Sequence, residues 1–148
     1  MAFDAFLKIE GIDGESLDKT HPNEIEISSF SWGVTNTGSG GSSGGGGGRA
    51  VLQDFHFTMK TSKASPNLML ACALGAHIQG ATLTCRKAGF EFMKVRLFEC
   101  LISEYDLGGD TGGDSPIDQM SINFVKIDFL YTVQRTGETV EDTFDQRL

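Results

Sequence analysis

The chain has 148 residues, a mass of 16.0 kDa and a formal net charge of −8, with 12 Lys and Arg against 20 Asp and Glu. This length is enough for one domain whose core needs no disulfide or metal, and the acidic balance disfavours nucleic acid or an anionic membrane surface as partner. No apolar run approaches the roughly 20 residues of a membrane span. The start lacks the basic and apolar segments of a cleavable signal peptide. We therefore expect one domain over 1–148 that is made in the cytoplasm.

Alternating apolar residues predict strands in the first half of the chain. Residues 3–9 alternate up to a turn at Gly11 and Gly14, and Phe55 to Met59 alternate after the glycine tract. Residues 24–35 are also extended, and their apolar phase slips between Ile27 and Phe30, which predicts a β-bulge.

One short helix is predicted over 66–74. Ser65 is placed to cap the first turn, Pro66 suits its start, and Gly75 is a natural stop. The three cysteines, Cys72, Cys85 and Cys100, are an odd number and each lies in an apolar periodic segment. They are interpreted as reduced core thiols.

The second half also alternates. Residues 81–85 and 92–105 predict two strands, the second with Val95, Leu97 and Leu101 in the same phase as Glu99. A glycine-rich turn at 108–114 precedes an extended run over 120–133, in which a phase change after Phe124 predicts a second bulge, and 134–148 is polar. About six to eight strands and one helix indicate a compact, mainly β antiparallel barrel or sandwich.

The glycine-rich stretch at about 36–49 resembles a phosphate-binding loop only in composition. Arg49-Ala-Val follows the glycines where Gly-Lys-Ser/Thr would be needed, and the next segment is strand-like. A flexible extended loop is the simpler interpretation.

Catalytic and metal-binding patterns are weak. Asp54 and His56 share a strand face and could begin a hydrolase site, yet no Gly-x-Ser-x-Gly elbow is present, and a surface pair on a sheet is the more common outcome. His21 has no partner at helical spacing, and Cys72 with His77 is the best local metal pair. We expect no catalytic residue, no metal site and no cofactor.

Several pieces of the sequence together resemble the hemolysin-coregulated proteins (Hcp), the inner tube proteins of type VI secretion systems. They are Met-Ala-Phe-Asp-Ala-Phe-Leu-Lys-Ile-Glu-Gly-Ile-Asp-Gly-Glu-Ser at 1–16, Ser-Phe-Ser-Trp-Gly at 29–33, the glycine tract, Gln-Asp-Phe-His-Phe at 53–57, Lys-Ala-Ser-Pro at 63–66, Thr-Cys-Arg-Lys-Ala-Gly at 84–89 and Asn-Phe-Val-Lys-Ile at 123–127. Near the end, Thr143-Phe-Asp stands where the family usually has Gly-Trp-Asp.

The resemblance implies a β-barrel with one helix on its side, assembled as a homohexameric ring. Such rings stack into a tube that a contractile sheath expels from a baseplate, with a spike protein at its tip. The protein is then itself secreted, and small effector proteins can travel in the lumen with the ring as their chaperone. The resemblance implies no enzyme activity and no cofactor.

The candidate site residues follow from the strand pattern and the resemblance. Ser29 and Ser31 alternate with Phe30 and Trp32, so they are expected on a polar, lumen-facing surface that contacts cargo; an ordinary solvent-facing strand is an equal alternative. The ring-stacking loop is expected to comprise Gly38, Gly40, Gly41, Gly44, Gly45, Gly46, Gly47, Gly48 and Arg49. Exposed strand edges and the helix over 66–74 are expected at the lateral interface.

A different class of function stays open on the sequence alone. The chain could be a stand-alone, monomeric β-barrel that binds a small ligand or a peptide at one mouth. Oligomeric state separates the two hypotheses, because a tube subunit must form a ring. A hydrolase built on Asp54 and His56 would require turnover that is lost in His56→Ala.

Overall fold

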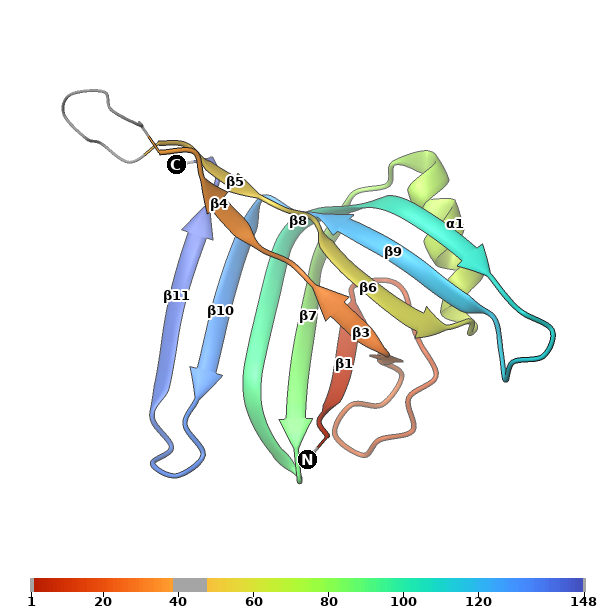
Figure 1. Ribbon diagram of the computed structural model, residues 1–148, viewed down its shortest axis with the longest axis horizontal. Coiled ribbons are helices and arrows are strands. Elements are labelled where there is room, and N and C mark those ends of the chain that lie inside the picture. The colour runs from red at the N-terminus through yellow and green to blue at the C-terminus, as the bar shows by residue number, and fades with distance from the viewer. Residues whose placement is uncertain (1, 39–47, 148) are drawn as a thin grey trace.

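The computed structural model describes residues 2–38 and 48–147 and is shown in Figure 1. In chain order its elements are β1 (Asp4–Ile9), β2 (Ile25–Glu26), β3 (Ser29–Ser31), β4 (Val34–Asn36), β5 (Ala50–Leu52), β6 (Phe55–Lys60), α1 (Ala64–Leu74), β7 (Ile78–Lys87), β8 (Phe90–Gly108), β9 (Ile117–Asn123), β10 (Lys126–Thr132) and β11 (Thr139–Asp145).

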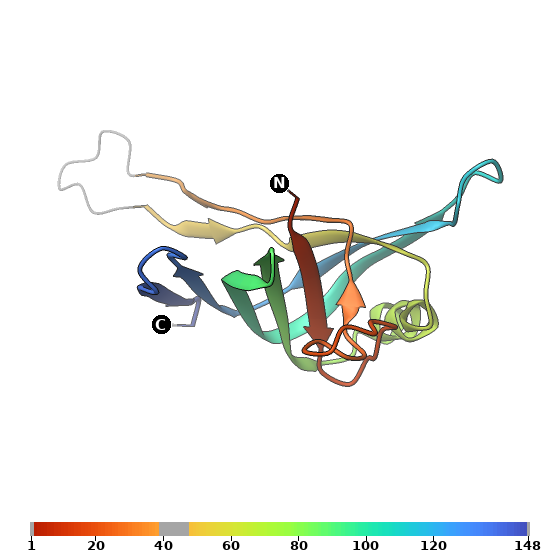
Figure 2. The same ribbon diagram turned by 90° about the horizontal axis from the view of Figure 1, so that it is seen from below.

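Nine strands form one antiparallel sheet that curves around the core. The main path is β2-β1-β7-β8-β9-β6-β3, and β10 pairs with β8 and with β11. The long strand β8 makes this possible, because residues 93–98 pair with β10 while residues 101–108 pair with β9. Strands β4 and β5 form a separate two-stranded ribbon that projects from the body (Figures 1 and 2).

The strand ladder does not close into the expected barrel. Its path ends at β2 and β3, which follow each other directly in the chain. The chain passes from one side to the other at Ile27, whose N–H donates to Ala5 at 3.2 Å, and Ser28, whose N–H donates to Thr58 at 2.8 Å. The change of apolar phase between Ile27 and Phe30, which was predicted as a β-bulge, is the point where the chain stops pairing with β1 and starts pairing with β6. The sheet is therefore rolled but remains open.

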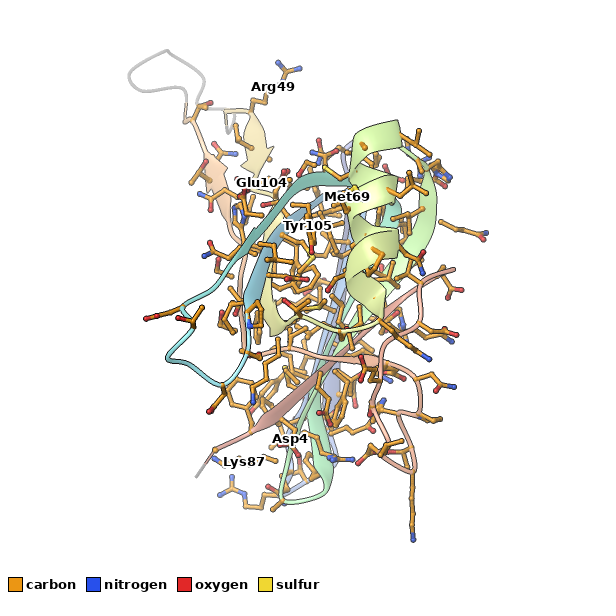
Figure 3. The ribbon with its side chains drawn as sticks, turned by 90° about the vertical axis from the view of Figure 1, so that its right-hand side faces the viewer. Asp4, Arg49, Met69, Lys87, Glu104 and Tyr105 are labelled. Carbon is orange, nitrogen blue, oxygen red and sulfur yellow. The ribbon has the colours of Figure 1, made fainter. Side chains whose placement is uncertain are left out.

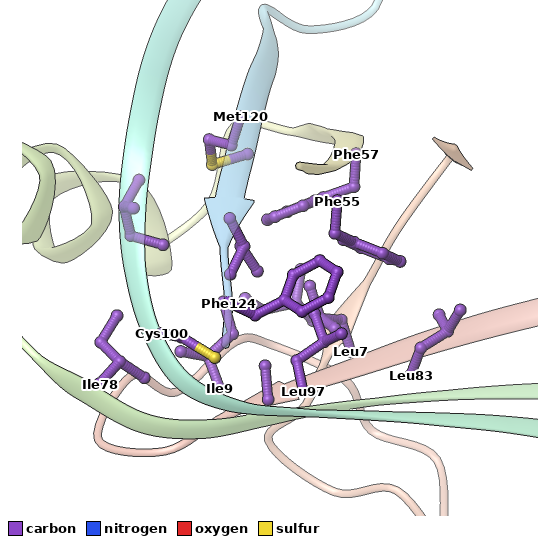
Figure 4. Close-up of a cluster of buried hydrophobic side chains, with 14 of the residues drawn as sticks. Leu7, Ile9, Phe55, Phe57, Ile78, Leu83, Leu97, Cys100, Met120 and Phe124 are labelled. Carbon is purple, nitrogen blue, oxygen red and sulfur yellow. The ribbon is translucent and has the colours of Figure 1, made fainter. Parts of the chain in front are cut away.

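The core lies inside the curved sheet (Figure 4). Phe55, Phe57 and Met59 of β6 are buried, which confirms the predicted alternation. Side chains from β1, β7, β8 and β9 complete it, among them Leu7, Ile9, Leu83, Val95, Leu97, Met120 and Ile122. Cys85 and Cys100 are buried and Cys72 is half-buried; all three are free thiols, as predicted.

The predicted phase of β8 is wrong beyond Leu97. Glu99 has a φ of 56°, in the left-handed region, and this reverses which face the following residues present. Cys100 and Ile102 are therefore buried and Leu101 is exposed. The change after Phe124 is likewise not a bulge, because there the chain leaves β9 and starts β10 along another part of β8.

Helix α1 starts two residues before its predicted beginning. Its N-cap is Lys63, whose backbone N–H donates to Glu15 Oε2 at 2.7 Å, and Ser65 is inside the first turn rather than a cap. The predicted stop is confirmed, since Gly75 has a φ of 59° and its N–H donates to Cys72 at 3.1 Å. Within the described residues, no helix has the length and apolar character to cross a membrane.

Candidate functional site

A polar surface, here called the polar face, covers the outside of β3, β6, β9 and the end of β8. Strand register aligns its side chains in two rows across the four strands. The rows are Ser31, His56, Ser121 and Glu104, and Ser29, Thr58, Gln119 and Asp106. Period-two alternation explains the arrangement, because the residues between these positions on β6 and β9 point into the core.

Hydrogen bonds join three members of the first row, His56, Ser121 and Glu104. Ser121 Oγ donates to Glu104 Oε1 at 3.0 Å, and His56 Nδ1 lies 2.5 Å from the same Oγ. A hydroxyl has one proton to give, so the serine that donates to Glu104 must accept from His56 Nδ1–H. His56 is then a donor to Ser121, which is the opposite of a general base activating a nucleophile.

Asp54 and His56, the candidates for the disfavoured hydrolase interpretation, have separate hydrogen-bond partners in the described structure. The two carboxylate oxygens of Asp54 accept from Ser103 Oγ at 2.6 Å and from Asn123 Nδ2 at 3.0 Å. Ser121 is only 2 % exposed, so substrate has little access to it. The arrangement is that of a satisfied polar sheet surface.

Ser29 and Ser31 lie at the edge of the polar face. Both are exposed, and Ser29 Oγ is 2.6 Å from Thr58 Oγ1. Together with His56, Gln119 and their neighbours they line a shallow groove of about 350 Å³. The structure thus places both predicted residues on one polar surface, in the outward phase that the alternation predicts.

The ribbon of β4 and β5 carries the described part of the predicted stacking loop. Arg49 is exposed near its end, where Thr37 N–H donates to the Arg49 carbonyl at 3.1 Å (Figure 3). Gly38 has a φ of 66°, and a Cβ on Gly48 would lie 2.3 Å from the Gly38 nitrogen. The close approach of the two strands therefore requires glycine there. Gly40, Gly41, Gly44, Gly45, Gly46 and Gly47 lie outside the described residues.

An apolar groove lies between this ribbon and the pair of strands β10 and β11. It has a volume of about 300 Å³ and is lined mainly by Trp32, Val34, Leu52, Phe129 and Phe144. Phe129 is 41 % exposed and Phe144 is 44 % exposed. These side chains lie on the same side of the sheet as the core, but in a region that the rest of the described chain leaves uncovered.

A second exposed apolar surface lies on α1. The helix has no charged residue, and its outer side presents Met69, Leu70 and Leu74, with exposures of 49 %, 51 % and 71 %. Figure 3 shows α1 toward the viewer with Met69 labelled. Both Figures 1 and 2 place α1 at one end of the molecule and β10 with β11 at the other. The two apolar surfaces therefore lie at opposite ends of the molecule.

Sequence reasoning missed the apolar groove, because it depends on how β4, β5, β10 and β11 meet in space. The exposed apolar surface of α1 could be predicted as a contact surface from the sequence, since a helix that is apolar all round is normally buried. Among the described residues, no three His, Cys, Asp or Glu side chains are grouped to hold a metal ion.

Comparison with known proteins identifies the family. The sequence profile described as "Type VI secretion system effector, Hcp" matches residues 6–131. Protein hcp1 of Pseudomonas aeruginosa is 41 % identical over 140 residues, which covers 91 % of this chain and 86 % of that protein.

Solved structures agree with the sequence match. A type VI secretion system effector from Yersinia pestis is 32 % identical with a TM-score of 0.84, over 96 % of this chain and 99 % of that one. Hcp1 from Salmonella typhimurium is also 32 % identical with a TM-score of 0.84, over 99 % of this chain and 96 % of that one. The chain therefore belongs to the Hcp family of the type VI secretion system.

Proposed function

We propose that the chain is a structural subunit of a type VI secretion inner tube, in which homohexameric rings stack and are expelled by a contractile sheath. In this role the protein starts in the cytoplasm, leaves the cell with the tube and contacts spike, sheath and baseplate components. The observation that carries the proposal is the pair of exposed apolar surfaces at opposite ends of the molecule, on α1 and between the ribbon and β10–β11.

This arrangement favours a head-to-tail contact. If α1 of one copy packs into the apolar groove of the next, each copy hides both surfaces, and a rotation of one sixth of a turn at each contact closes the proposed hexameric ring. Leu74 at 71 % exposure and Phe144 at 44 % are costly to leave in water on an isolated subunit. Burial of both in every contact supplies the driving force for assembly.

The polar face suits the wall of a wet channel. Several of its side chains form hydrogen bonds with one another, as in the contacts of Ser121 with Glu104 and of Ser29 with Thr58. Ser31 is exposed, and its register partner His56 is exposed beside it. We assign the lumen and the contact with small effector proteins to this face, with Ser29 and Ser31 as cargo contacts.

The ribbon suits contact between rings. It projects from the body, and the close pairing of Gly38 with Gly48 marks the end of its described part. A contact made by glycines costs more conformational entropy than one made by other residues, so stacking should be weak for free rings.

Complementation between two variants tests the head-to-tail contact. Leu74→Glu places a charge on the apolar surface of α1 and leaves the groove unchanged. Phe144→Glu places a charge in the groove and leaves the surface of α1 unchanged. Each variant alone should be monomeric by light scattering during size exclusion. Mixed in equal amounts they should form a dimer and nothing larger, because one intact contact remains.

A matched control is Gln79→Glu, an exposed residue on β7 outside both surfaces, which should keep the wild-type mass. Two outcomes would contradict this contact: unchanged oligomers in both variants, or a mixture that stays monomeric although the wild type assembles. A wild type that is monomeric throughout would favour the stand-alone binding module.

A further inference from the structure

The loop over residues 11–24, here called the strap, crosses one end of the core and is tied down on two sides. Its own backbone bonds include Gly14 N–H to Asn23 O at 2.8 Å and Ser16 N–H to Glu24 O at 3.0 Å. On one side Glu15 holds the N-cap of α1. On the other side the strap reaches the end of the β7–β8 hairpin, through residues that include His21.

His21 is buried in this contact. It is 7 % exposed, and its ring stacks on Phe6 of β1 with 4.6 Å between ring centroids. Nδ1 lies 3.1 Å from both oxygens of Glu24 in the strap, and Nε2 lies 2.7 Å from Glu91 Oε2 on β8. Both ring nitrogens therefore face carboxylate oxygens.

That geometry specifies the protonation state. A neutral imidazole has one N–H and one bare nitrogen, and a bare nitrogen facing a carboxylate would set two lone pairs against each other. Only the imidazolium donates from both nitrogens, so it alone satisfies Glu24 and Glu91 together.

Two further cations, Arg86 and Lys94, form ion pairs around the contact. Arg86 of β7 lies over the Phe6 ring at 4.8 Å and pairs with Asp18 at 2.9 Å and Asp4 at 3.2 Å. Lys94 of β8 is 3.9 Å from the second oxygen of Glu91, which leaves Oε2 to His21. Arginine stays charged at all physiological pH values, so His21 is the titratable tie within this cluster.

We propose that His21 is a pH-sensitive latch, whose imidazolium fastens the strap to the β7–β8 hairpin and releases it when the ring loses its proton. The ion pair between Arg86 of β7 and Asp18 of the strap also holds the strap in place, and it does not depend on pH near neutrality. Deprotonation therefore loosens the strap without unfolding the domain.

The direction of the effect follows from linkage. Burial is the largest influence on the pKa of His21 and lowers it, but hydrogen bonds to Glu91 and Glu24 together outweigh burial, and the pKa is raised above 6.5. A raised folded pKa means that the latch stabilises the closed strap fully below pH 6.5 and loses this effect as pH rises through the folded value. The opening equilibrium should increase tenfold for each unit by which the pKa exceeds that of the open strap.

An NMR titration of the full chain tests the latch. The ring of His21 should titrate above pH 6.5, and the amide signals of strap residues 15–23 should shift with the same midpoint. Hydrogen-exchange protection of these amides, corrected for the intrinsic rate at each pH, should fall across that midpoint. Glu91→Gln should lower the His21 pKa, and His21→Gln should abolish the pH dependence of protection.

His77 provides the matched control. Its Nε2 is also 2.7 Å from a carboxylate, Glu99, yet its side chain is 63 % exposed and neither residue belongs to the strap. His77→Gln should leave the strap titration unchanged. A His21 that titrates at or below pH 6.5, or strap signals that do not follow its midpoint, would overturn the proposal.

Discussion

Ser65 in the first turn of α1 donates a hydrogen bond from Oγ to Oδ2 of Asp118 on β9, whose side chain has no exposure to solvent. The same carboxyl group accepts from Thr61 Oγ1 at 2.7 Å and from Tyr105 OH at 3.0 Å. Burial, followed by the bond to Asp118, raises the pKa of Tyr105. Asp118 thus fastens the start of the proposed assembly helix to the sheet.

Asp118→Asn should destabilise the domain. The three hydroxyl donors would meet an amide with one acceptor oxygen and an NH₂ group that cannot accept, which leaves a buried donor unsatisfied. We expect the free energy of unfolding, measured by urea denaturation, to fall by about 2–3 kcal/mol. Asp106→Asn, on the exposed end of β8, should change it by less than about 0.5 kcal/mol. Equal effects of the two changes would contradict this role.

Asp18→Asn should reduce stability in a pH-dependent way. Arg86 donates to both oxygens of Asp18, at 3.0 and 2.9 Å, and this pairing, with help from Thr20, holds the pKa of Asp18 well below its usual range. A depressed folded pKa means that the stabilisation is present above about pH 4 and disappears as pH falls through the folded value. The gap in melting temperature between wild type and variant should therefore be constant from pH 5 to 7 and narrow toward pH 2.

Asp13→Asn is the control for this series, because Asp13 is exposed in the same strap. Its melting temperature should track that of the wild type across the whole pH range. If the gap for Asp18→Asn did not narrow in acid, the ion pair with Arg86 would not be the source of the stability.

Gly14→Ala should strain the strap. A Cβ at Gly14 would lie 2.5 Å from the carbonyl oxygen of Glu24 and 2.8 Å from the Cα of Ile25, and backbone atoms cannot swing aside as a flexible side chain can. We expect a loss of about 1–3 kcal/mol in thermal or urea unfolding. In Gly112→Ala the nearest atom, 3.9 Å away, is an oxygen of Asp110, so that variant should be far less affected.

Ser31→Glu should weaken retention of a co-expressed effector protein without unfolding the domain, because it adds a bulky charge next to His56 on the polar face. Ser115→Glu, at a half-buried position in the loop before β9 and outside this face, is the comparison. Co-purification of effector with each variant measures the effect. Unchanged cargo binding in Ser31→Glu would remove Ser31 from the proposed lumen contact.

The sequence predicts best where a strand has one buried face. In β6 the alternation of Phe55, Phe57 and Met59 with polar residues identified both the strand and its buried side. Gly75 ended the helix as predicted, since glycine alone adopts the left-handed conformation without cost.

The sequence predicts poorly where an unusual backbone conformation, or a contact with a segment distant in the chain, determines the structure. Glu99 has a positive φ, which reverses the face of β8 on which the following residues are buried. No glycine marks this position in the sequence. Ser65 has the chemistry of a cap, but its hydroxyl is used by Asp118, more than fifty positions along the chain. The polar segment 139–145 forms β11 because β10 offers it an unpaired edge. The polar face could be anticipated from alternation at Ser29 and Ser31, whereas the apolar groove could not.

The mass of the wild-type protein in solution tests the central proposal most directly. Light scattering during size exclusion at several loading concentrations should give six times the 16.0 kDa of one chain, unchanged on dilution. A mass of one chain at every concentration would contradict assembly into a ring through the two apolar surfaces.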